Sequence, residues 1–74
     1  MSRLPQISGW ECVKALQRAG FVIDRQRGSH FILIQREPWK RVSVPNHKTL
    51  KIGTLRGIIS QSGLTVEEFL DLLA

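Results

Sequence analysis

The chain has 74 residues, with 11 Lys or Arg, six Asp or Glu and a formal net charge of +5 at pH 7. This length predicts one domain over residues 1–74 with a modest hydrophobic core, and it leaves no room for a large cofactor cleft. No apolar stretch is long enough for a membrane span, and the segment Met1–Pro5 lacks the apolar core of a signal peptide. We therefore expect a chain that acts in the cytoplasm, with no membrane partner.

The first helix is expected to begin at Ser8. Ser8 and Glu11 have the spacing of a capping box, in which each side chain accepts a hydrogen bond from the other residue's backbone amide. Gly20 supplies a left-handed stop. Between these signals, apolar residues recur at helical spacing and predict a buried stripe: Cys12, Val13, Leu16 and Ala19.

Three strands are expected next. Phe21–Ile23 opens the first, Gly28–Ser29 turns the chain, and His30–Arg36 forms the second, which is rich in β-branched and aromatic residues. Glu37–Lys40 is the next predicted turn. Alternation of polar and apolar residues in Arg41–Val44 predicts a half-buried third strand, which ends at a proline. The short turns predict an antiparallel meander.

The last third of the chain predicts two helices. A polar, basic loop, Asn46–Gly53, precedes a helix with Thr54 as its expected N-cap and Gly63 as its stop. Thr65 and Glu68 repeat the capping-box spacing and start a short terminal helix. The order α-β-β-β-α-α predicts a two-layer α+β domain with the helices on one face of a three-stranded antiparallel sheet. The other face and the loops are then left for partners.

Basic residues are concentrated in the middle of the chain. Residues 25–56 contain one acidic residue, Glu37, and eight basic ones: Arg25, Arg27, Arg36, Lys40, Arg41, Lys48, Lys51 and Arg56. This segregation predicts a basic surface and a polyanionic partner, with nucleic acid the first candidate. A basic surface without a binding role is the alternative.

The cysteine content and the spacing of metal-ligating residues predict neither a disulfide nor a metal site. The single cysteine, Cys12, has no partner in the chain for a disulfide and falls within the apolar stripe of the first helix. We expect a buried thiol in a reducing compartment. His, Cys and acidic residues do not recur at the spacing of a zinc site. The sequence therefore predicts no metal and no other cofactor.

A polar turn with a histidine carries the candidate chemistry. His30 follows Gly28 and Ser29, lies next to the arginines Arg25 and Arg27, and precedes an apolar strand. Histidine takes or gives a proton near neutral pH, and RNA supplies its own nucleophile, the 2′-hydroxyl. The arginines can bind the scissile phosphate, and the amides of the Gly-Ser turn are additional donors. His30 is thus the expected catalytic residue, although a histidine at the start of a strand is more often structural.

The basic loop offers further contacts. Lys48 and Lys51 are candidates for binding phosphate. Three roles stay open for His47: a second proton-transfer partner, a base or phosphate contact, or a polar loop residue, of which we favour a contact or structural role. Of the two tryptophans, Trp39 is the better candidate for an exposed contact.

Several segments, in this order, resemble the HicA (YcfA-like) toxins: Leu4-Pro5, Ser8-Gly9, Leu16 to Phe21, Arg25 to His30, Val44-Pro45 with His47, and Gly53 to Arg56 with Ile58 and Ile59. The resemblance spans nearly the whole chain. It implies an RNA-cleaving toxin (mRNA interferase) of a toxin-antitoxin system, with a fold similar to the double-stranded-RNA-binding domain and His30 as the catalytic residue. It also implies a HicB-like antitoxin as partner.

The sequence thus favours a metal-independent endoribonuclease that acts on RNA. A non-catalytic RNA-binding module that uses the basic surface is the alternative, but such a module has no need of an imidazole after a glycine turn. A helix-turn-helix regulator fits poorly, because three strands separate the helices.

Overall fold

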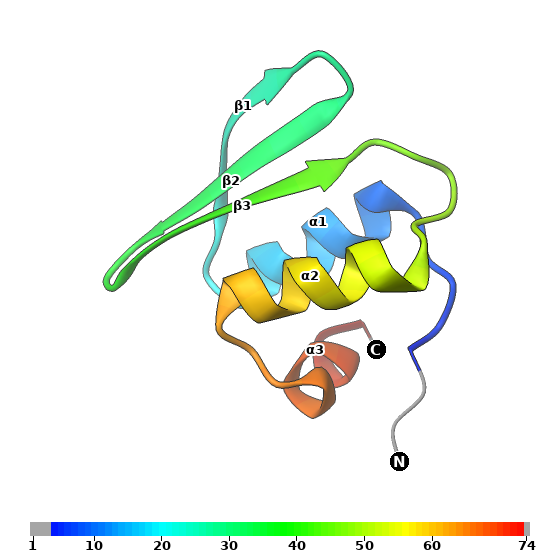
Figure 1. Cartoon of the computed structure of the whole chain (residues 1–74). Helices are drawn as coiled ribbons and strands as arrows, with labels where there is room; N and C mark the ends of the chain where they lie inside the picture. The colour runs from blue at the N-terminus through cyan, green and yellow to red at the C-terminus, as the bar shows by residue number, and fades with distance from the viewer. Residues whose placement is uncertain (1–3, 74) are drawn as a thin grey trace.

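A computed structural model describes residues 4–73, so the first three residues of the segment considered for a signal peptide lie outside the described residues. Three strands form one antiparallel sheet in the order β1-β2-β3. The elements, in chain order, are α1 (Gly9–Arg18), β1 (Val22–Arg27), β2 (His30–Arg36), β3 (Trp39–Pro45), α2 (Ile52–Ser62) and α3 (Val66–Leu73) (Figure 1). The predicted order of elements and the α+β class are confirmed.

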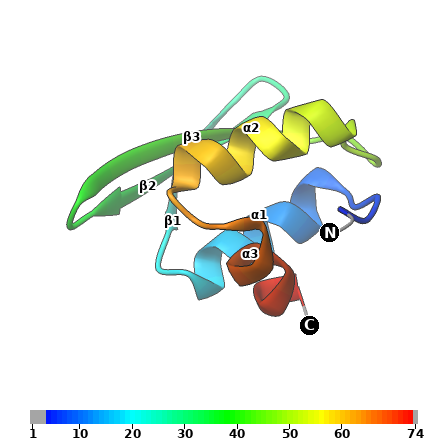
Figure 2. The ribbon, with the colours of Figure 1, turned by 60° about the horizontal axis from the view of Figure 1, so that its bottom comes forward.

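The helices cover one face of the sheet and leave the other uncovered (Figures 1 and 2). Leu33 of β2 and Val42 and Val44 of β3 point into the helical layer and are fully buried. They pack with residues from every helix, among them Leu16, Leu55 and Phe69. Among residues 4–73, no helix has the length and apolar character needed to cross a membrane.

Cys12 lies in this core, as predicted. It is fully buried, and burial raises the pKa of its thiol from 9.0 to about 12, because the thiolate would lose its hydration.

Local signals explain most of the helix ends. The Ser8 hydroxyl accepts from the Glu11 amide at 3.0 Å, and the Glu11 carboxylate accepts from the Ser8 amide at 2.9 Å. Thr65 and Glu68 form the same reciprocal pair at 3.1 and 2.8 Å. Gly63 ends α2 with φ +79°, a value that favours glycine. Both predicted capping boxes and this stop are therefore confirmed.

The predicted start of α2 is wrong. Lys51, rather than Thr54, is the N-cap, and its side chain makes no capping hydrogen bond. Tertiary contacts fix this end instead, since the Leu50 amide donates to the Ile7 carbonyl at 2.8 Å and the Leu50 side chain is buried. Thr54 is consequently an exposed residue inside the helix.

The third strand starts earlier than predicted. The turn after β2 is only the two residues Glu37 and Pro38, joined by a cis peptide bond, and Trp39 already pairs with Arg36 in the ladder. Trp39 therefore belongs to β3 and takes part in the alternation between the two faces of the sheet.

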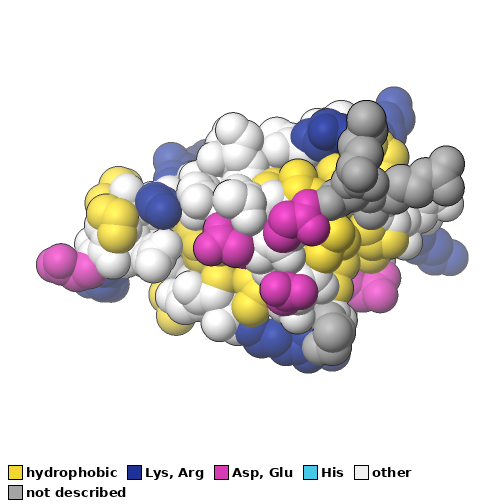
Figure 3. Space-filling model, turned by 90° about the horizontal axis from the view of Figure 1, so that it is seen from below, with side chains coloured by type: hydrophobic (Ala, Val, Ile, Leu, Met, Phe, Trp, Pro, Cys, Tyr) yellow, Lys and Arg dark blue, Asp and Glu magenta, His cyan; other side chains and the backbone are white. Residues whose placement is uncertain are grey.

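Carboxylates are concentrated in the helical layer. Four of the six carboxylates lie on the helices, namely Glu11 on α1 and Glu67, Glu68 and Asp71 on α3. Figure 3 views the molecule from the helical side, where acidic side chains gather and neither histidine is visible. Lys40 is an exception among the basic residues of the sheet, because its ammonium donates to the Ser62 carbonyl at 3.2 Å and neutralises the C-terminal end of α2.

Candidate nucleic-acid interface on the open face of the sheet

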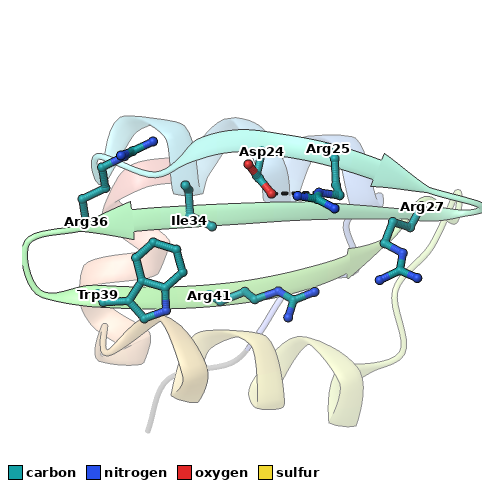
Figure 4. Close-up of a pocket in the computed structure, with 7 residues that line it drawn as sticks. All are labelled: Asp24, Arg25, Arg27, Ile34, Arg36, Trp39 and Arg41. Carbon is teal, nitrogen blue, oxygen red and sulfur yellow. Dashed lines mark hydrogen bonds and ion pairs between the residues drawn. The ribbon is translucent and has the colours of Figure 1, made fainter.

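The uncovered side of the sheet, here called the open face, is rich in arginine. Register and strand alternation place eleven residues on it: Val22, Arg25, Arg27, His30, Ile32, Ile34, Arg36, Trp39, Arg41, Ser43 and Pro45. Figure 4 looks onto this face and shows arginines from all three strands. Four arginines with a single histidine make a surface suited to an anionic ligand.

The turn between β1 and β2 fixes the position of His30. Gly28 has φ +58° and Ser29 does not have a positive φ, which is the pattern of a type II′ turn. The Gln26 side-chain amide also donates to the Gly28 carbonyl at 3.3 Å. Because a two-residue turn sets the register, Arg27 pairs with His30 and their side chains project from the same face.

A bulge at Asp24 adjusts the rest of β1. The ladder pairs Ile23 with Leu33 and then Arg25 with Ile32, so Asp24 is left without a partner residue. A regular strand would pair Asp24 with buried Leu33 on the helical face. The bulge avoids burying a carboxylate there while Arg25 stays on the open face. Asp24 forms an ion pair with Arg25 at 2.9 Å.

Backbone hydrogen bonds join the His30 turn to the loop after β3. The Asn46 amide donates to the Ser29 carbonyl at 2.6 Å, and the Gly9 amide donates to the His47 carbonyl at 2.9 Å. A Cβ on Gly9 would overlap the Pro45 carbonyl, so only glycine allows the start of α1 to pack this closely. His47 thus lies near the same end of the sheet as His30, with its side chain exposed.

Two adjoining hollows follow the open face. One is lined by Asp24, Arg25, Arg27, Ile34, Arg36, Trp39 and Arg41 (Figure 4). The second shares Arg27 and Arg41 with it and adds His30, Ile32, Ser43 and Gln61. Ile32 and Ile34 are each only 5% exposed although no helix covers them, so the neighbouring side chains shield them.

The predicted site residues divide into two groups. Arg25, Arg27 and His30 share the open face, with Gly28 and Ser29 forming the adjacent turn. Lys48 and Lys51 are exposed in the loop before α2 and do not line the hollow at His30. The structure therefore does not bring the two lysines directly beside the histidine.

The sequence analysis counted Arg36 and Arg41 among the basic residues and named Trp39 as an exposed contact, but did not place these three at the site; all of them line this surface. Arg36 lies an even number of positions after His30 on the same strand, so the alternation of side chains would have placed both on one face. The pairing of Trp39 with Arg36 depends on the length of the turn after β2, which the sequence analysis overestimated by two residues. Within residues 4–73, no three His, Cys, Asp or Glu side chains come together as a metal-binding cluster.

The histidine turn, the sheet and the first two helices all fall within one matched region. A family model described as the HicA toxin of bacterial toxin-antitoxin matches residues 9–64, well over half of the chain. The chain belongs to the HicA toxin family. The resemblance noted in the sequence is thereby confirmed. A separate comparison with curated proteins finds no match for this HicA-family chain.

Proposed function

We propose that this HicA-family toxin is an endoribonuclease that acts in the cytoplasm and cleaves RNA bound across the open face, with His30 as the catalytic residue. The observation that carries the proposal is the pairing of Arg27 with His30 on an exposed, arginine-lined surface. Family membership supports a toxin role. The sheet supplies a rigid support for both side chains, because each belongs to a paired strand.

The chemistry needs few groups. The His30 imidazole takes the proton of the RNA 2′-hydroxyl, and the resulting oxygen attacks the adjacent phosphorus. The bond from phosphorus to the 5′ oxygen breaks, and that oxygen takes a proton from water. The products are a 2′,3′-cyclic phosphate and a 5′-hydroxyl. Arg27, across the ladder from His30, supplies positive charge where negative charge develops on the phosphorus oxygens.

The other basic residues serve binding. Arg25 and Arg41 extend the positive surface away from the histidine, and Lys48 and Lys51 extend it over the adjoining loop. The amides of Gly28 and Ser29 are additional hydrogen-bond donors at the turn. We assign the exposed side chain of His47 a contact or structural role, and its backbone carbonyl accepts from the Gly9 amide at the start of α1.

An antitoxin partner is implied by membership in a toxin-antitoxin family. We propose that a HicB-like antitoxin presents acidic side chains to the open face and inhibits the toxin by covering His30. A partner of complementary charge is attracted to the same surface as RNA, so the two should compete.

The test is cleavage of single-stranded RNA by the purified protein in the presence of EDTA, followed by analysis of the product ends. The proposal predicts cleavage without added metal and ends that carry 2′,3′-cyclic or 3′-phosphate and 5′-hydroxyl groups. Cleavage that requires magnesium and leaves 5′-phosphates contradicts it. RNA binding without any cleavage would favour the alternative, a non-catalytic RNA-binding module.

A further inference from the structure

Among residues 4–73, Trp39 is the most exposed large hydrophobic side chain, with 63% of its surface accessible. It begins β3 on the open face, directly opposite Arg36. A large aromatic ring left this exposed on a small domain marks a contact surface more often than a structural position.

The surroundings of Trp39 form a cradle for a flat ligand. Figure 4 shows the indole reaching from β3 toward Ile34 on β2, with Arg36 at the same end of the sheet and Arg41 farther along β3. These four residues line one hollow. Ile34 provides an apolar floor, and the two guanidinium groups provide positive charge around it. The acid of this hollow, Asp24, is already paired with Arg25.

This combination suits one unpaired nucleotide. An aromatic face stacks on a base of any sequence, and a nearby guanidinium binds the phosphate or stacks on the base. A base inside a duplex offers no free face, so the combination favours single-stranded RNA. An apolar peptide would match the indole but would leave the arginines without partners.

The position of Trp39 separates it from the chemistry. Arg36, the partner of Trp39, lies six positions after His30 on β2, which corresponds to about 20 Å along an extended strand. We propose that Trp39, Ile34, Arg36 and Arg41 form a base-stacking subsite for single-stranded RNA. This proposal rests on the proposed RNA-cleaving function, and it places the stacked base a few nucleotides from the phosphate that is cleaved at His30. The RNA then runs along β2 and β3 across the open face.

The test uses a labelled single-stranded oligonucleotide of 2′-O-methyl RNA. It lacks the nucleophilic hydroxyl, so it reports binding whether or not the protein cleaves RNA. Trp39→Ala should weaken its affinity by about tenfold or more, as expected for the loss of one stacked base. The matched control is Trp10→Ala, which removes the other exposed tryptophan, 47% accessible on α1, and should change affinity by less than about twofold. Circular dichroism verifies that both variants fold.

Abasic substitution locates the stacked nucleotide. Removing the base at one position of the oligonucleotide should weaken binding to the wild-type protein but not weaken binding to Trp39→Ala any further. Trp39→Phe should restore most of the affinity, because it keeps an aromatic face. Wild-type affinity in Trp39→Ala overturns the subsite, whatever the cleavage assay gives. Loss of antitoxin binding with unchanged RNA binding in that variant also overturns it and makes Trp39 a protein contact.

Discussion

Arg27 lies directly opposite His30 in the ladder between β1 and β2, and both side chains project from the open face. The type II′ turn through Gly28 and Ser29 fixes this pairing, because it leaves only two residues between them. The His30 imidazole and the Arg27 guanidinium thus lie on the same surface because of one short hairpin, whose two strands are adjacent in sequence.

The arginines of the open face should control the salt dependence of RNA binding. Replacing Arg27 and Arg41 together with Gln should lower the slope of log affinity against log salt by about 1.4, since each phosphate contact to a single strand contributes roughly 0.7. Replacing Lys48 and Lys51 together should flatten the slope and weaken binding about equally for all sequences. Arg56→Gln, on α2, is the matched control. An unchanged slope in the arginine pair would place the RNA on another surface.

Asp24 should oppose RNA binding. It contributes a negative charge to the arginine-lined hollow and is paired with Arg25 at 2.9 Å. Asp24→Asn frees the guanidinium and should strengthen binding at low salt, with the difference fading as salt screens the surface. Binding titrations at two salt concentrations measure this effect. Weaker binding in Asp24→Asn would mean that the carboxylate mainly orients Arg25 for its contact.

RNA and antitoxin should exclude each other. A fluorescent RNA is bound to the His30→Ala protein, and the antitoxin is then added. Stoichiometric release of the RNA is expected, because both ligands need the open face. A stable ternary complex would contradict occlusion and indicate that the antitoxin acts from another surface.

Two glycines should respond in opposite directions to alanine. Nothing lies within 4 Å of a Cβ at Gly57, which is inside α2, so Gly57→Ala should stabilise the fold by about 1 kcal/mol and leave activity unchanged. Gly9→Ala should destabilise it by about 1–3 kcal/mol, because the new methyl group overlaps the Pro45 carbonyl. Thermal unfolding measures both. A stable Gly9→Ala protein would show that the loop after β3 adjusts freely.

Stability should fall in alkaline solution because of Cys12. Its thiol has a pKa raised from 9.0 to about 12, so between these values the unfolded chain loses a proton that the folded chain keeps. The free energy of unfolding therefore decreases as pH rises from 9 to 12. Cys12→Ala should lack this part of the decrease. Identical pH dependence in both proteins, measured by denaturant unfolding, would show that the thiol ionises readily in the fold.

Signals read within a few residues predicted most of the fold. Ser8 with Glu11 marked the start of α1, and Gly28 marked the hairpin turn, because both act through adjacent backbone groups. Thr54 was wrong as a cap because packing of Leu50, a tertiary contact, sets the start of α2. Such contacts leave no local pattern in the sequence.

The site was only partly predictable for a related reason. His30 and Arg27 were identified from adjacency in sequence. Trp39 was named as an exposed contact, but its place on the open face opposite Arg36 required the length of the turn after β2, which is two residues instead of the four predicted. Charge alone also could not distinguish the roles of Lys40 and Arg41. Lys40 donates to the end of α2, whereas Arg41 lies on the open face.

The most direct test of the account compares His30→Ala and His47→Ala with the wild-type toxin in RNA cleavage and in growth inhibition. His30→Ala should abolish both activities while RNA affinity and the circular dichroism spectrum stay nearly unchanged, because the imidazole transfers protons and contributes little to binding. His47→Ala should cost less. A His30→Ala protein that still cleaves RNA would contradict the assignment of catalysis to His30. If His47→Ala were inactive at the same time, catalysis would belong to His47 instead.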